Sequence, residues 1–398
     1  MRVSTFIQVM LSGTTAALLA GHAYALDGED MLKKLNAAYA SYGSQIVADS
    51  VTADGSTVVA KGVKLKVENT EKPMDVPLGD ITFDDVEEAD DGGYYAGTVT
   101  FQNVDLSKDG SHFTAKDIQI DGLSIPGTPS TDSIDGMILY ESAHTGPITL
   151  EQDGKRVFQV DKTEANLNVA DDSSSIDFDS TVSGIWADLS DVKDPKGQEA
   201  VNALGLTNVN GNIVTKGSWT AASGKFDITE FSIDARDVGK INLTLSMSGY
   251  TTQLMKAMQD ATKAAAANPD KKAGEAALGM TMMGLLQQLS FNSAALRFDD
   301  ASITKRVLDY VAKQQGVPAD QFTQSLKGMV PIMMAQLNMP DLQNQVSAAV
   351  SKYLDDPKSI EIKAAPASPV AAPMIMGAAM GAPQTLPQVL GVTVTANQ

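Results

Sequence analysis

Residues 225–248 read KFDITEFSIDARDVGKINLTLSMS, two segments of alternating character joined by a short polar connection. Apolar side chains recur at nearly every second position in 226–233 and in 241–247, with Asp, Lys, Ser or Thr between them. A period of two is typical of a β-strand with one apolar and one solvated face. The stretch therefore predicts two antiparallel strands of a meander whose apolar rows point inward.

The same alternation of apolar and polar residues continues through most of the chain before residue 250. Turn signals such as Asp54-Gly55 and Lys61-Gly62 separate the segments. The spacing is too irregular for a solenoid, so ordinary antiparallel sheet is the interpretation. We expect a pair of strands within 58–67 with a turn at Lys61-Gly62, and further strands at 95–101, 118–123, 148–150, 157–160, 165–169, 176–178, 182–186 and 213–219. An amphipathic helix that carries Met31, Leu35, Ala38 and Tyr39 should precede them.

After residue 249 the apolar period becomes helical. The segment 271–289 is apolar on most of its circumference, which predicts a helix buried on more than one side. Strand patterns return before, between and after the helices, so this half should rejoin the sheet. We expect helices at 251–267, 271–289, 303–315, 322–337 and 342–354, and strands at 289–298, 360–362 and 389–394.

These patterns predict an α+β fold: an elongated, curved antiparallel β-sheet with helices packed on one face or end, and a helix-rich C-terminal half. The expected organisation is a signal peptide at 1–25, an acidic β-rich region with an N-terminal helix at 26–250, and a Met-rich helical region at 251–398 that returns to the sheet. One continuous body is favoured over two domains with a boundary near residue 250.

The N-terminus predicts export. Arg2 precedes an apolar run over 6–20, and Ala23 and Ala25 supply the small residues that a signal peptidase reads. The run is too short and too interrupted for an anchor, which needs about 20 apolar residues. The 398 residues contain no Cys, which favours a bacterial periplasm over a eukaryotic secretory route. We expect a periplasmic protein cleaved after Ala25.

Charge is uneven along the chain. Residues 26–250 carry 17 Lys and Arg against 38 Asp and Glu, whereas 251–398 carry 12 against 11, within a net charge of −19. An acidic surface repels the phosphates of nucleic acid and of anionic lipid. Nucleic acid is therefore excluded as a partner, and the carboxylates of the first half are interpreted as a solubilising surface.

Catalytic signatures are missing from the sequence. Beyond the signal peptide only His112 and His144 could act as general acids or bases, and both lie in segments that read as turns or loops. No G-x-S-x-G, H-E-x-x-H, P-loop or dinucleotide fingerprint occurs. We therefore expect no catalytic residue, no metal site and no cofactor, and a periplasmic hydrolase that uses His112 or His144 is the alternative.

Methionine is enriched in the second half, which holds 12 of the 18 Met. Thioethers bind Cu(I), which makes copper handling a second alternative. Flexible Met side chains also line adaptable apolar grooves or fill irregular cores. The predicted hydrophobic ligand-binding residues are Leu254, Met258, Leu278, Met282, Leu285, Phe322, Met329 and Met333.

Three segments carry a resemblance to known proteins: 226–247, 295–303 (ALRFDDASI) and 386–392 (LPQVLGV). Over roughly its last 170 residues, the chain resembles uncharacterised periplasmic proteins of Gram-negative bacteria and is loosely similar to the AsmA-like and YdgA-like envelope families. The resemblance implies a long twisted sheet, with an apolar concave face that carries lipid in some members.

Together these observations predict a non-enzymatic periplasmic protein of envelope maintenance. Its expected ligand is a lipid or another hydrophobic molecule, and its expected partners include other envelope proteins.

Overall fold

The computed structural model describes residues 26–39, 44–67, 74–336 and 339–398, so the predicted signal peptide lies outside the described residues. The chain divides into two units, each built from separate segments of sequence. Unit 1 comprises Met1–Gln102, Ile120–Glu141 and Leu167–Ile176, and unit 2 comprises Asn103–Gln119, Ser142–Asn166 and Asp177–Gln398.

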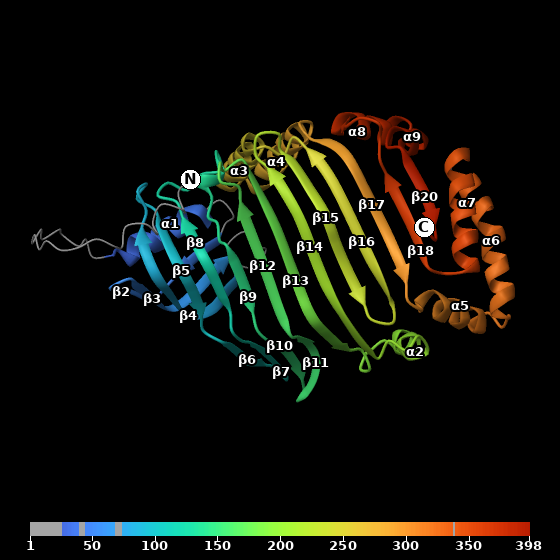
Figure 1. The fold of residues 1–398 in the computed structure, drawn as a ribbon, viewed down its shortest axis with the longest axis horizontal. Helices are drawn as coiled ribbons and strands as arrows, with labels where there is room; N and C mark the ends of the chain where they lie inside the picture. Colours follow the sequence, from blue (N-terminus) through green and yellow to red (C-terminus); the bar gives the residue numbers. More distant parts are fainter. Residues whose placement is uncertain (1–25, 40–43, 68–73, 337–338) are drawn as a thin grey trace, which may run out of the picture. The chain divides into compact units, whose positions relative to one another are not determined.

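Unit 1 is a small antiparallel sheet with one long helix (Figure 1). β1 and β2 pair with β3, β3 pairs with β4, and β4 pairs with β5, which continues to β8. Its elements are α1 (Gly28–Tyr39), β1 (Ser44–Val47), β2 (Ser50–Asp54), β3 (Thr57–Val67), β4 (Met74–Glu88), β5 (Tyr94–Phe101), β8 (Gln119–Ile125) and the 3₁₀ turn η2 (Ile134–Gly136).

The core of unit 1 lies between α1 and the sheet. Met31 and Leu35, one helical turn apart on α1, are buried against alternate residues of β3, β4 and β5. Gly28 allows this close approach, because an added Cβ would lie 2.8 Å from the side chain of Val51. The predicted N-terminal helix and its buried stripe are therefore confirmed for Met31 and Leu35.

Unit 2 contains the large antiparallel sheet that the alternation predicts. Six of its strands pair with one another in antiparallel register, each with the next in this order: β14 (Asn208–Thr220), β15 (Lys225–Ala235), β16 (Gly239–Ser248), β17 (Ser290–Asp300), β18 (Ser359–Ala364) and β20 (Val392–Ala396). The chain leaves the sheet after β16 and returns at β17, so the strands before and after the helices form one layer (Figure 1).

Further strands complete unit 2. β7 pairs with β6 and β10, β10 with β11, and β9 with β12. These strands are β6 (Val104–Lys108), β7 (Ser111–Ala115), β9 (Ser142–Thr145), β10 (Ile148–Gln152), β11 (Lys155–Val160), most of β12 (Lys162–Val169) and of β13 (Ser175–Asp188), and β19 (Val370–Ala371).

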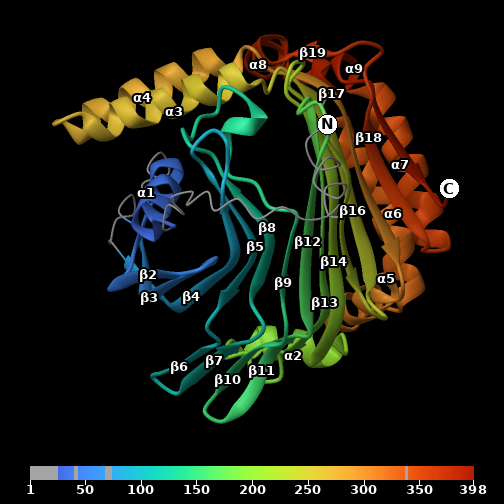
Figure 2. The same cartoon turned by 60° about the vertical axis from the view of Figure 1, so that its left-hand side comes forward.

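Helices α3 (Thr252–Ala267) and α4 (Lys271–Leu286) form a hairpin that extends from one end of this sheet (Figure 2). Side chains cap both helices: Thr251 accepts from the N–H of Leu254 at 3.2 Å, and Asp270 accepts from that of Ala273 at 3.1 Å. The sequence Asn268-Pro269 ends α3, as predicted.

The other helices of unit 2 are α2 (Pro195–Ala203), α5 (Ile303–Gln314), α6 (Ala319–Ala335), α7 (Pro340–Asp355), α8 (Ala372–Gly381), α9 (Leu386–Val389) and the 3₁₀ turn η3 (Pro383–Thr385). Of the helices in the described part of the chain, none is both long enough and apolar enough to cross a bilayer.

Candidate functional site

One face of the unit 2 sheet carries a continuous row of aliphatic side chains. Ile233 lies opposite Ile241 on β15 and β16, and Leu243 lies opposite Leu296 on β16 and β17. Leu296 also lies opposite Ile362 on β18. Directly opposed residues share a face of a sheet, as do residues two apart on one strand. We call Ile233, Ile241, Leu243, Leu296 and Ile362 the apolar sheet face.

These side chains are open to solvent although they are aliphatic. Their exposed fractions are 41% for Ile233, 43% for Ile241, 36% for Leu243, 47% for Leu296 and 50% for Ile362. A single exposed aliphatic residue is common, but a contiguous group on adjacent strands marks a binding surface. The predicted inward row is therefore present but only partly covered.

The opposite face of the same strands is polar. Lys240 and Lys216 pair with Glu230 at 3.2 and 3.6 Å, and Arg297 pairs with Asp299 at 2.8 Å. Hydrogen bonds from the hydroxyl of Ser232 and the ammonium of Lys240 lower the pKa of Glu230. The sheet thus separates a charged face from an apolar one.

Helix α7 covers only one edge of the apolar side. Its residues Ala349 and Tyr353 pack with Val394 and Ala396 of β20, and Phe298 and Ile360 join this cluster. Register places Ile360 opposite both Phe298 and Ala396, so the cluster lies on the same side of the sheet as the apolar sheet face. The helix covers β20 and the parts of β17 and β18 that carry Phe298 and Ile360, and it leaves Leu296 and Ile362 about half exposed.

An aromatic cluster lies on the same side, toward the end of β15 that carries Phe226. The Phe178 and Phe226 rings stack with centroids 5.9 Å apart, and Tyr250 meets Phe226 edge-on at 6.4 Å. Trp219, opposite Phe226, donates its indole N–H to the Tyr250 carbonyl at 2.7 Å. Gly217 leaves room for Phe178, because an added Cβ would lie 2.4 Å from that ring.

The predicted ligand-binding residues lie in two separate places of unit 2 (Figure 1). Leu254, Met258, Leu278, Met282 and Leu285 are on the α3–α4 hairpin, where Leu254 is buried and the others are half-buried. Phe322, Met329 and Met333 are on α6, where Met329 and Met333 are exposed. The structure thus gathers five of the eight on one hairpin and places three elsewhere.

The two histidines lie on strands, which corrects the prediction of turns or loops: His112 is on β7 and His144 on β9. Both segments form strands rather than turns because β7 pairs with β10 and β9 pairs with β12, in each case antiparallel. Both ring nitrogens of His112 face carboxylates, Asp105 at 2.9 Å and Glu151 at 3.5 Å. These carboxylates raise the pKa of His112, and the arrangement places a carboxylate where a nucleophile–base pair needs a hydroxyl.

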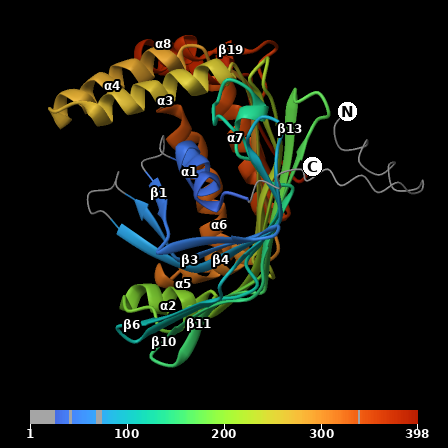
Figure 3. The ribbon, with the colours of Figure 1, turned by 90° about the vertical axis from the view of Figure 1, so that its left-hand side faces the viewer.

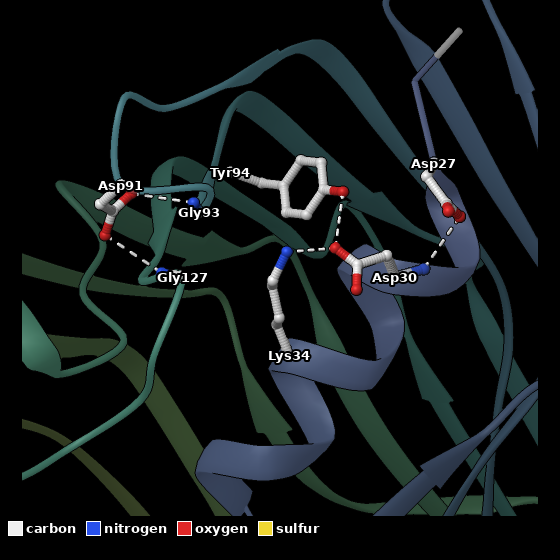
Figure 4. A network of polar contacts seen from close by, with 7 residues as sticks. All are labelled: Asp27, Asp30, Lys34, Asp91, Gly93, Tyr94 and Gly127. Atoms are coloured by element: carbon white, nitrogen blue, oxygen red, sulfur yellow. Dashed lines mark hydrogen bonds and ion pairs between the residues drawn. The ribbon is translucent and has the colours of Figure 1, made fainter. Parts of the chain in front are cut away.

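A second polar cluster ties α1 to the sheet of unit 1 (Figure 4). The Tyr94 hydroxyl donates to Asp30 at 3.0 Å, and Lys34 pairs with the same carboxylate. Hydrogen bonding from Lys34 lowers the pKa of Asp30, whereas burial and the bond to Asp30 raise the pKa of Tyr94. These groups satisfy one another's hydrogen-bonding capacity, so we assign the cluster a structural role: it fixes α1 on the sheet of unit 1.

Asp91 plays a similar part beside this cluster (Figure 4). Its carboxylate accepts from the backbone N–H groups of Gly93 at 2.8 Å and Gly127 at 3.1 Å, and these bonds lower its pKa. Both glycines are needed, because an added Cβ would lie 2.3 Å from the Ile125 carbonyl oxygen at Gly93 and 2.2 Å from that of Asp91 at Gly127.

Comparison with protein families gives a match over part of unit 2. The sequence profile of a family described as "Uncharacterized protein" matches residues 232–397. This segment includes β16, β17, β18, β20 and α7, and therefore all five residues of the apolar sheet face and the helix at its edge. No curated protein matches the chain.

The sequence pattern predicts ligand binding on the Met-rich helices, and only the resemblance to envelope proteins points to an apolar face of the sheet. The alternation identifies Ile233, Ile241 and Leu243 as one row, but a period of two says only that residues share a face. Whether a helix covers that face depends on long-range packing.

Proposed function

We propose that this protein binds a lipid or another hydrophobic ligand on the apolar sheet face of unit 2, as a non-enzymatic component of a bacterial envelope. The observation that carries the proposal is the exposure of five aliphatic side chains in register on four adjacent strands.

The dimensions of this surface suit an acyl chain. Four strands at a spacing of about 4.8 Å give a row of roughly 14 Å from β15 to β18. Each methylene group removed from water contributes about 0.8 kcal/mol. The apolar sheet face itself consists of aliphatic side chains, so the binding energy comes from apolar contact, and the aromatic cluster and α7 supply walls.

The finer fold prediction supports the same function. A curved sheet with helices on one face or end would leave a concave apolar surface, as the resemblance to AsmA-like and YdgA-like envelope proteins implies. Export to the periplasm, with cleavage after Ala25, would place this surface between two membranes. Intact-mass measurement of exported protein tests the location: a mature chain that begins at Leu26 supports it, and retention of Met1 in the membrane pellet contradicts it.

Mass spectrometry of organic extracts tests ligand binding directly. Protein purified under mild conditions should release a lipid or another apolar molecule, and the yield per mole should fall in Leu296→Glu, which places a charge in the centre of the row. The matched control is Thr393→Glu, an exposed position on β20 that faces the opposite side of the sheet, beside Lys363. Equal yields from all three proteins, or no extractable ligand in any, would contradict the proposal.

A further inference from the structure

Two segments of unit 2 contain no charged side chain. Residues 276–296 and 364–398 have no Asp, Glu, Lys or Arg, in a chain where these residues make up 20% and the net charge is −19. The first segment includes most of α4 and the start of β17, and the second includes α8, α9 and β20. Such segments are unusual on the surface of an acidic protein, where charges normally keep the surface solvated.

The fold brings these two segments to the same end of the sheet. Ser290 and Phe291, just after α4, pair with Ala371 and Val370, just before α8. The N–H of Ala372, the first residue of α8, donates to the carbonyl of Leu289 at 2.9 Å. The C-terminal end of α4 and the N-terminal end of α8 therefore lie side by side (Figures 1 and 3).

Apolar side chains at this end project into solvent, which corrects the prediction of a helix at 271–289 buried on more than one side. On α4, Leu278, Met282 and Leu285 are half-buried, whereas Met280 is 78% exposed, Met283 61% and Leu286 41%. On α8, Met374 is 61% exposed and Met380 89%. We call Met280, Met283, Leu286, Met374 and Met380 the uncharged end.

Lysines lie where α4 begins, at the tip of the hairpin. Lys271 and Lys272 are its first two residues and are both exposed. Lys272 precedes Met283 by about three helical turns, so both project from the same side of α4. Glu275, the carboxylate within α4, projects about 60° from Lys272 and about 20° from Leu286 around the helix axis. Asp270, the N-cap residue of α4, precedes both lysines. The side of α4 that carries Met280 and Met283 thus combines exposed Met with Lys272.

We propose that the uncharged end docks on the surface of a lipid bilayer. In this arrangement α4 lies in the plane of the interface, with Met280 and Met283 among the upper acyl chains and Lys272 against a phosphate group. Interfacial helices place exposed apolar side chains and neighbouring basic residues against a bilayer in this way. The proposal goes beyond ligand binding on the apolar sheet face, because it concerns a different surface and a different kind of partner.

Charge and length select a bilayer as the occupant. A chain with a net charge of −19 is repelled by anionic lipid, so contact requires a surface without carboxylates, and the uncharged end provides one. The apolar part of α4, residues 276–286, is about 16 Å long at 1.5 Å per residue. That length is too short to cross the roughly 30 Å hydrocarbon core and suits a helix that lies on it.

Vesicle flotation tests the proposal, with exported full-length protein and vesicles of phosphatidylethanolamine and phosphatidylglycerol. Met280→Glu/Met283→Glu adds two carboxylates to the outward side of α4. Gln321→Glu/Gln324→Glu adds the same charge at exposed positions of α6 and is the matched control. Met374→Glu/Met380→Glu tests α8 independently. All six positions are exposed, and circular dichroism with thermal unfolding verifies that each variant is folded.

We expect the wild type and the α6 control to float with vesicles, and the α4 and α8 variants to lose binding by at least about tenfold. Absence of wild-type flotation, or equal flotation of all four proteins, would overturn the proposal. Concentration-dependent dimers that the α4 variant abolishes, without flotation of the wild type, would show that a second copy covers this surface and would also overturn it. Ligand extraction from the same samples is a separate readout, because it depends on the apolar sheet face.

Discussion

Leu243 on β16 and Leu296 on β17 lie directly opposite each other, and both side chains are more than a third exposed. Opposed leucines at the centre of a six-stranded region are normally covered by a helix or a second sheet. Here α7 reaches the strands at one edge only. The exposure of this leucine pair is the basis of the ligand-binding proposal. Because the two side chains are not buried in a core, substitutions there should change ligand binding more than the free energy of unfolding.

The α3–α4 hairpin should tolerate truncation of its outward side but not of its buried side. Leu254 is 1% exposed and Met283 is 61% exposed. Leu254→Ala should lower the free energy of unfolding by about 2–5 kcal/mol through lost burial and a cavity. Met283→Ala should change it by no more than about 0.5 kcal/mol. Urea denaturation of both variants measures the difference, and equal losses would contradict this assignment of the two sides.

Two glycines should respond in opposite directions to alanine. Gly249 has φ +90°, and an added Cβ would lie 2.1 Å from the Gln288 carbonyl oxygen. Gly249→Ala should therefore destabilise unit 2 by more than about 1 kcal/mol. Gly279, inside α4, has no atom within 4 Å of an added Cβ. Gly279→Ala should stabilise by about 0.5–1 kcal/mol, because alanine is the better helix former. Thermal unfolding of both variants measures the sign of each change in stability.

Asp91 should make the stability of unit 1 depend on pH. The N–H groups of Gly127 and Gly93 lower its pKa in the folded protein, so its contribution is complete above the unfolded value of about 3.9 and is lost as pH falls through the lower folded value. Asp91→Asn keeps one acceptor oxygen and should cost about 1 kcal/mol at neutral pH. Urea midpoints of the two proteins should converge as the pH falls below the lowered folded pKa of Asp91. A constant difference at every pH would exclude this role.

His112 should titrate above its ordinary range because Asp105 and Glu151 stabilise the imidazolium. Since the folded pKa is raised, any stabilisation from this group is present at low pH and is lost as pH rises through the folded value. Asp105→Asn removes the nearer carboxylate and should move the pKa of His112 toward about 6.5. NMR titration of the imidazole protons measures the shift. An unchanged titration in the variant would show that the contact at 2.9 Å is not maintained in solution.

The sequence predicts much of the fold because local periodicity reflects which residues share a face. The strands at 226–233 and 241–247, the buried Met31 and Leu35 and the end of α3 at Asn268 are all present. Element ends were less predictable. The last strand begins at Val392 rather than 389, because Leu386–Val389 forms the short helix α9.

Capping of α5 shows how tertiary contacts override a local signal. Ser302 is at the N-cap position, but its hydroxyl donates to the carbonyl of Asp237 at 2.6 Å. Asp300 accepts from the N–H of Thr304 instead, at 2.8 Å. The exposure of the apolar sheet face could not be predicted for a similar reason. Whether Ile241 and Leu296 are exposed depends on which strands α7 covers, and no local sequence pattern determines that.

The most direct test of the ligand-binding account is the dissociation constant of a fluorescent fatty-acid analogue for wild type, Leu296→Glu and Thr393→Glu. Both substitutions add one carboxylate, but only Leu296 lies on the apolar sheet face. The account predicts that Leu296→Glu weakens binding by at least about tenfold, a loss of roughly 1.4 kcal/mol, while its unfolding midpoint stays near that of the wild type. Thr393→Glu should bind as the wild type does. Equal dissociation constants for all three proteins would contradict it.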